Sequence, residues 1–566
     1  MPDVKYDHYY RYPELTQILH DFAAAYPHLV RIESIGKSYE GRDIWVAAVT
    51  NDATGPDLHK PALWIDGTIH SPEIAPSLAC LYIIETLCRN YGRDEEITYA
   101  LDTRTFYICP RVSPDGAEYL LADQPRLIYS SARKYPHDEE VSGGLIPQDI
   151  DGDGRMLVMR IPDPNGSWKV CDVEPRLMVR RQPAERGGQY YRLMREGLFE
   201  DYDGFQLKIR AREERLDLNR NFPVSWRPEN EQPGAGDFPA SEPEVRNVVE
   251  FVTKHRNITG AISLHTYTGA IMRPYSDRSD DAFPPDDLQV YNTIGDKAAE
   301  ITGYPWFSTY HETRVHPSLY TTGTYDGWLY DHLGIFGWTV DLWAPHRMAG
   351  IPDKNIGKWE KDHPLEDDLK LLRWADENLG EDGYVDWYPF EHPQLGPIEL
   401  GAWNKLKTFT NPPIRFLHDE MVRFPPWALW QALISPLLEV AGVVAEPLGG
   451  DLYRVRLAVL NSGWLPTYVT KKALMRKVVR GVRCQITLPD NMELVEGGAM
   501  QEIGQLEGRA YTPMGLPGWP GGEPTDHIGV AEWIVRAPQG GEVGLAAWHD
   551  RAGRVRSSIR LERSEE

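Results

Sequence analysis

Two histidines and one glutamate stand where this chain could bind a metal ion. His70 and Glu73 lie three residues apart, directly after a β-rich run. His265 ends a second apolar run that begins at Gly260. Taken singly, a His beside a carboxylate is more often a surface ion pair, and a strand-end His is more often a core residue. Together, two His and one Glu would form a zinc site with an open position for water, as in hydrolytic zinc enzymes.

The segments around these residues predict an α/β fold. Short β-rich or buried apolar runs alternate with amphipathic helical patterns, which is typical of a sheet flanked by helices. Sites in such sheets form at the carboxyl ends of the strands, where His70 and His265 stand. The expected strands cover residues 44–50, 62–66, 105–110, 260–265 and 337–342, and the clearest helices cover 15–23, 245–252 and 367–379.

The chain divides into two predicted domains. We expect an α/β domain over residues 1–380, with an insertion at about 121–215. Residues 381–440, rich in Pro and Trp, are expected to be a linker or packing segment. Residues 441–566 consist of short β-rich runs separated by Gly and Pro, which predicts an all-β, sandwich-like accessory domain.

At this point the sequence resembles the zinc carboxypeptidases of the carboxypeptidase A type. The resemblance implies a mixed, eight-stranded carboxypeptidase sheet, a peptide substrate with a free C-terminal carboxylate, and one Zn²⁺ per chain. The matching motifs, in the expected order, are Gly36 to Arg42, His70-Ser-Pro-Glu73, Ser113-Pro-Asp-Gly116, Asp217-Leu-Asn-Arg-Asn221, Ser263-Leu-His265-Thr-Tyr and Gly337-Trp-Thr-Val-Asp341-Leu.

The resemblance also implies residue roles. His70, Glu73 and His265 would bind zinc, which activates a water and polarises the scissile carbonyl. Asn219 and Arg220 would hold the terminal carboxylate of the substrate.

Further roles fall on residues whose assignment the resemblance leaves open. Arg160 is the first candidate for the arginine that polarises the carbonyl, and Arg155 is the second. Tyr320 best fits the family's substrate-capping tyrosine. Tyr325 is an alternative, or it lines a specificity pocket beside Asp326.

The expected general base departs from the family pattern. Asp341 stands where the family has Glu, so its carboxylate is one methylene shorter. A base must come within about 3 Å of the water it deprotonates. The predicted activity is hydrolysis of the C-terminal amide bond of peptides. The alternatives are a related zinc amidase acting on peptidoglycan-type or glutamyl peptides, and a catalytically impaired binding protein on the same fold.

A second metal site is possible in the insertion. Asp149, Asp151 and Asp153 match the start of a calcium loop, but position twelve of that loop is Arg160 instead of an acidic ligand. A solvated acidic turn is the favoured interpretation, and Ca²⁺ is the alternative.

Composition excludes other classes of function. The chain has 566 residues, and 60 Lys+Arg against 84 Asp+Glu give a net charge of −24, which argues against nucleic-acid binding through bulk charge. The N-terminus lacks a signal-peptide pattern, and no apolar run is long enough to span a membrane. We therefore expect a cytoplasmic protein without a membrane partner; the sequence leaves its oligomeric state open.

Overall fold

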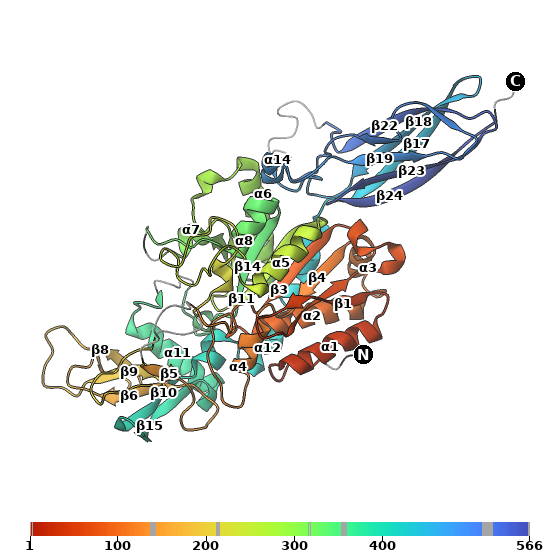
Figure 1. The fold of residues 1–566 in the computed structure, drawn as a ribbon. Helices are drawn as coiled ribbons and strands as arrows, with labels where there is room; N and C mark the ends of the chain where they lie inside the picture. The colour runs from red at the N-terminus through yellow and green to blue at the C-terminus, as the bar shows by residue number, and fades with distance from the viewer. Residues whose placement is uncertain are drawn as a thin grey trace.

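A computed structural model describes residues 2, 4–135, 143–210, 215–314, 316, 318–352, 359–511 and 524–563. The described residues form an α/β body, a smaller sheet beside it, and an elongated β domain that ends in the C-terminus (Figure 1).

The α/β body is built on an eight-stranded mixed sheet, as predicted. Its strand order is β1-β2-β4-β3-β11-β14-β12-β13. Strands β4, β3, β11 and β14 run parallel to one another, and the remaining pairings are antiparallel except between β12 and β13. The strands are β1 (Val30–Lys37), β2 (Asp43–Val49), β3 (Ala62–Gly67), β4 (Thr105–Cys109), β11 (Ile258–Thr266), β12 (Ala270–Arg273), β13 (Trp306–Ser308) and β14 (Phe336–Leu342).

Helices cover both faces of this sheet (Figure 1). The predicted first helix is confirmed, because Leu15, Ile18, Leu19 and Phe22 form one buried face of α1. Helix α2 is buried almost throughout, which fits its nearly continuous apolar sequence. The helices of the body are α1 (Tyr12–Ala25), α2 (Ala75–Asn90), α3 (Glu95–Thr103), α4 (Pro114–Leu120), α5 (Pro243–Lys254), α6 (Pro285–Thr302), α7 (Thr309–Glu312), α8 (Tyr325–Trp328), α9 (Pro345–Met348) and α11 (Leu365–Asn378).

The smaller sheet combines the insertion with the segment expected to be a linker. Strand β16 pairs with β6, which joins residues 384–403 to the insertion. Residues 381–440 therefore do more than connect two domains, since they also contribute α12 (Ile414–Met421) and α13 (Phe424–Leu433), which pack on α2. The sheet has the order β15 (Tyr384–His392), β16 (Gly396–Trp403), β6 (Val158–Pro162), β9 (Tyr191–Arg195), β7 (Trp168–Val170) and β8 (Met178–Arg180), and β5 (Leu145–Pro147) pairs with β10 (Gly197–Phe199) alongside it.

The C-terminal domain consists of two four-stranded antiparallel sheets over one apolar core, which confirms the predicted all-β domain. It starts at β17, three residues before the predicted boundary. Its strands are β17 (Leu438–Gly449), β18 (Leu452–Asn461), β22 (Ile528–Arg536) and β20 (Glu493–Glu496) in one sheet, and β21 (Met500–Glu502), β19 (Arg483–Thr487), β23 (Gly541–His549) and β24 (Gly553–Leu561) in the other.

Charged groups join this domain to the α/β body. The buried carboxylate of Asp287 accepts hydrogen bonds from the backbone N–H groups of Lys471 (2.7 Å) and Lys472 (2.9 Å), where α14 (Lys471–Arg476) begins. Arg551 donates to the carbonyl of Gly334, two residues before β14. Among the helices of the described residues, none has the length and apolarity needed to cross a membrane.

Candidate zinc site

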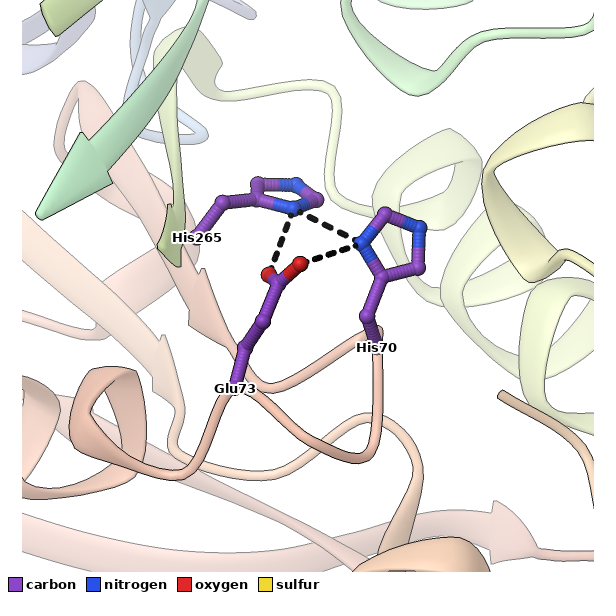
Figure 2. A group of neighbouring side chains, drawn as sticks. All are labelled: His70, Glu73 and His265. Carbon is purple, nitrogen blue, oxygen red and sulfur yellow. Dashed lines mark hydrogen bonds and ion pairs between the residues drawn. The ribbon is translucent and has the colours of Figure 1, made fainter. Parts of the chain in front are cut away.

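His70, Glu73 and His265 converge on one point (Figure 2). The Nδ1 atom of His70 lies 2.9 Å from Oε1 of Glu73, and Nδ1 of His265 lies 3.0 Å from Oε2 of the same carboxylate. The two Nδ1 atoms are 3.2 Å apart. All three side chains are buried, and each offers one ligand atom to the same small volume.

The sheet explains how residues so distant in sequence meet. Strands β3 and β11 are parallel neighbours, with Gly67 of β3 paired to Leu264 of β11. Their carboxyl ends therefore lie side by side, and the turn after β3 brings His70 and Glu73 to His265. The Thr68 hydroxyl donates to the Glu73 carbonyl (2.8 Å), which closes this turn.

A second layer of side chains orients the two histidines. Nε2 of His70 lies 3.1 Å from Oδ1 of Asp217, so this nitrogen donates and Nδ1 faces the cluster. Nε2 of His265 lies 3.3 Å from the hydroxyl of Ser263, which donates to Asp66 (2.7 Å). Each imidazole is thus held with one nitrogen turned toward the shared point.

The electrostatics of the cluster favour a bound cation. Burial lowers the pKa of His70, but the carboxylates of Glu73 and Asp217 outweigh it and raise that pKa to about 10. Burial raises the pKa of Glu73, and the two histidines outweigh it and lower that pKa to about 2. The residues therefore stabilise positive charge at this point.

The donor set fits zinc. Imidazole nitrogen and carboxylate oxygen are both zinc ligands, and tetrahedral ligands about 2.1 Å from one ion lie roughly 3.4 Å apart. The separations of 2.9 to 3.2 Å require only a small outward shift to reach that value. Three protein ligands are the number found in catalytic zinc sites, which keep a fourth position open.

Asp341 lies beside this cluster. It is paired with His265 in the register of β14 and β11, and its Oδ2 accepts a hydrogen bond from Thr268 (2.9 Å). Burial raises the pKa of Asp341 to about 6, an effect that His265 opposes and Glu73 reinforces. A cavity of about 500 Å³ is lined by both Glu73 and Asp341.

Asn219 and Arg220 lie close to the cluster through Asp217. Asp217 caps the short helix Leu218–Arg220, and its Oδ1 accepts both the Asn219 N–H (2.9 Å) and the His70 ring N–H. The Arg220 guanidinium lies 3.7 Å from the other oxygen of Asp217. Asn219 uses its side-chain oxygen to hold the backbone N–H of Tyr325 (2.8 Å).

The structure does not bring Arg160 to the cluster. It lies in β6 directly opposite Glu399 of β16, and their charged groups are 2.7 Å apart. Its guanidinium also stacks on the ring of Trp387, 4.5 Å from the centroid. Arg160 is therefore a structural residue of the smaller sheet, and the other candidate, Arg155, pairs with Asp153 (2.5 Å). Neither arginine is among the residues that line the 500 Å³ cavity.

The two tyrosine candidates occupy different surroundings. Tyr320 is 39% exposed, and its ring lies under the guanidinium of Arg227, 4.6 Å from the centroid. Tyr325 is 2% exposed and packs on Phe222 in the core of the α/β body. A buried Tyr325 is not a pocket wall that a substrate can reach. Asp326 is also buried, and it accepts a hydrogen bond from the N–H of Gly327 (2.8 Å).

The acidic turn of the insertion does not support the calcium alternative. Asp149, Asp151 and Asp153 lie near one another. Their oxygens, however, accept hydrogen bonds from backbone N–H groups within the turn; Asp149, for example, accepts the N–H of Gly152 (2.7 Å). Asp153 also forms an ion pair with Arg155. The favoured interpretation, a solvated acidic turn, agrees with this geometry.

Two residues beside the cluster were not singled out from the sequence. In the sequence Asp217 stands out only as the first residue of the motif at 217–221, and Tyr129 belongs to no motif. The Tyr129 ring stacks on His70 with centroids 4.6 Å apart, and it lines the cavity with Glu73 and Asp341. Burial is the main cause that raises the pKa of the Tyr129 phenol well above its usual value, and nearby carboxylates, including that of Asp217, add to it. The hydroxyl therefore keeps its proton.

Comparisons with known proteins agree with this geometry. A family profile described as zinc carboxypeptidase matches residues 15–151 and 188–363, which is more than half of the chain, and a profile of unknown function matches residues 437–560. Rat carboxypeptidase A2 is 23% identical over 345 residues, which are 61% of this chain and 62% of that protein. The chain thus matches about three-fifths of that relative's length.

Two further similarities are shorter or more distant. A zinc carboxypeptidase of Saccharothrix mutabilis subsp. capreolus is 33% identical over 117 residues, covering 21% of this chain and 27% of that protein. The crystal structure of carboxypeptidase A from Helicoverpa armigera has 18% identity and a TM-score of 0.40, and the match covers 66% of this chain and 76% of that one.

Proposed function

Because this chain belongs to the zinc carboxypeptidase family, we propose that it is a zinc-dependent carboxypeptidase that removes the C-terminal residue from peptides. The observation that carries this proposal is the His70, Glu73 and His265 cluster, which shares a cavity with the carboxylate of Asp341. A metal with an open position next to a base is the arrangement that hydrolyses an amide.

His70, Glu73 and His265 would hold Zn²⁺, which when bound polarises the scissile carbonyl and lowers the pKa of a water. Asp341 accepts the proton of the attacking water at its carboxylate and passes it to the departing amine. The hydrogen bond from Thr268 fixes the direction of this carboxylate.

Arg220 and Asn219 would bind the free carboxylate of the substrate. Arginine offers a planar pair of donors that suits a carboxylate. Asp217 connects this pair to His70, so one buried side chain fixes the position of the carboxylate-binding pair relative to the zinc cluster.

Tyr129 would supply a hydrogen bond to the oxygen that becomes negative during the attack. Its ring is fixed by stacking on His70, and its phenol keeps its proton. A donor whose position is fixed by the protein stabilises developing charge more than a freely reorienting donor in water. The family resemblance implies an arginine in this role, but the candidate Arg160 forms an ion pair with Glu399 instead.

The test combines metal content with product release. The purified protein is expected to contain one Zn²⁺ per chain and to release free amino acids from the C-termini of a mixed peptide panel, and a chelator is expected to abolish release. Asp341→Asn should retain zinc and lose release, whereas Asp341→Glu, which restores the family residue, should retain release.

The other results distinguish the alternatives. Release only from glutamyl or peptidoglycan-type peptides would identify a specialised amidase. Zinc without release from any peptide, together with a gain of activity in Asp341→Glu, would identify a binding protein whose shortened base is the defect. Protein without zinc would refute the mechanism.

A further inference from the structure

The cavity beside the zinc cluster extends well beyond the reacting groups. It measures about 500 Å³, a size suited to binding part of a small organic ligand. Glu73 and Asp341 line it together with apolar side chains that come from outside the eight-stranded sheet. These are Leu127, Pro147, Met156, Leu157, Val158 and Trp403.

This apolar wall is held in place by hydrogen bonds. Glu196 is 1% exposed, and its carboxylate accepts the backbone N–H of Leu157 (2.7 Å) and that of Ile150 (2.7 Å). Val158 then enters β6, where it pairs with Arg195 of β9 and with Gly401 of β16. Leu157 and Val158 are therefore tied to the smaller sheet, which holds this part of the wall in place.

The charged groups around the cavity do not favour one sign of substrate. Arg195 and Lys405 line it together with Glu196 and Glu360, and the two other carboxylates of the lining, Glu73 and Asp341, belong to the zinc cluster and the proposed base. The Glu196 carboxylate is occupied by backbone N–H groups. Size and apolarity, rather than charge, are the properties that this cavity can select.

The position of the carboxylate-binding pair decides which part of a peptide enters the cavity. Asn219 and Arg220 are not among the residues that line it. With the terminal carboxylate on Arg220 and the scissile carbonyl at the zinc cluster, the cavity is left for the residues on the amino side of the scissile bond.

We propose that this cavity is an apolar subsite that selects peptides with a large apolar side chain immediately before the scissile bond. The inference rests on the proposed carboxypeptidase function. The smaller sheet, which the insertion and residues 384–403 build together, is then a specificity device.

The test uses blocked dipeptides that share one C-terminal residue and differ in the residue before it. Leu and Phe at that position are expected to give a kcat/KM about 10- to 100-fold above Gly, Asp or Lys, which is the discrimination that an apolar pocket provides. Val158→Ala and Met156→Ala should each reduce the ratio of kcat/KM for the Leu substrate to that for the Gly substrate several-fold. Val179→Ala, the same truncation in the same sheet but away from the cavity, is the matched control.

A binding measurement separates this proposal from the proposed function. The same dipeptides are titrated into the Asp341→Asn variant by calorimetry, so turnover is not required. Tighter binding of the Leu peptide than the Gly peptide, reduced by Val158→Ala, supports the subsite even if no cleavage is found in the wild-type protein. Equal kcat/KM and equal affinity for all dipeptides, or a preference for Asp or Lys, would overturn it.

Discussion

Asp217→Asn isolates the charge that Asp217 provides to the candidate zinc site. The substitution keeps the shape of the side chain. Its remaining oxygen can still accept the N–H of Asn219 and the ring N–H of His70, which now lie 2.9 and 3.1 Å from Oδ1. Only the negative charge behind the imidazole is removed, together with its 3.7 Å interaction with Arg220.

The expected loss is a 10- to 100-fold weaker affinity for Zn²⁺, as is typical when the carboxylate partner of a metal-binding histidine is changed. This corresponds to about 1.4 to 2.7 kcal/mol of binding free energy. The direction follows from the structure, because Asp217 is one of the two carboxylates that raise the pKa of His70 and so favour positive charge there.

The affinity for Zn²⁺ is measured by competition with a chromophoric chelator. A second measurement then gives the zinc concentration at which the metal-free protein regains half of its hydrolytic activity. Asp115→Asn is the control, since Asp115 is a buried carboxylate of the same domain that binds Ser38 (2.7 Å) and Arg42 (2.7 Å). The control should lose stability but not zinc affinity. An unchanged zinc affinity in Asp217→Asn, with the protein folded, would refute the role assigned to Asp217.

Three further predictions concern other residues. Arg160→Met should leave kcat/KM within about twofold and lower the free energy of unfolding by about 1 to 3 kcal/mol, because its partner is Glu399 rather than substrate; a loss of activity with normal stability would contradict this. Tyr129→Phe keeps the ring on His70 but removes the hydroxyl, so kcat should fall about 10- to 100-fold at normal zinc content; unchanged kcat would exclude the phenol from the reaction. Burial, with the Arg551 charge, lowers the pKa of His549 from 6.5 to about 4. The unfolded chain therefore binds a proton at this residue that the folded chain does not, so denaturant titrations from pH 6.5 to pH 4 should show wild-type stability falling by about 3 kcal/mol more than that of His549→Gln.

Local sequence patterns predicted the zinc cluster because its residues sit where strands end. His70 and Glu73 are three residues apart after one buried strand, and His265 is at the end of another. Parallel pairing of those strands then brings them together. Asp341 is predicted by the family resemblance rather than by this pattern, and the structure places it opposite His265 in the adjacent strand.

Contacts that depend on distant pairings could not be predicted in this way. Asp217 reaches His70 across 147 residues, and no periodic pattern encodes that contact. Arg160 was misassigned because its partner, Glu399, lies 239 residues away in a segment without a clear strand pattern. Strands β15 and β16 alternate only weakly between buried and exposed residues, so residues 381–440 gave no sign of completing a sheet.

The junction between the α/β body and the C-terminal domain has a consequence for how the chain unfolds. Asp287 is fully buried, and two of the N–H groups that it accepts belong to the C-terminal half of the chain. Removing the C-terminal domain would leave the Asp287 carboxylate without these two hydrogen bonds. Arg551 would also no longer donate to the Gly334 carbonyl in the turn before β14. Strand β14, which carries Asp341, therefore depends on contacts from the C-terminal domain, and we expect the two parts to unfold as one cooperative unit.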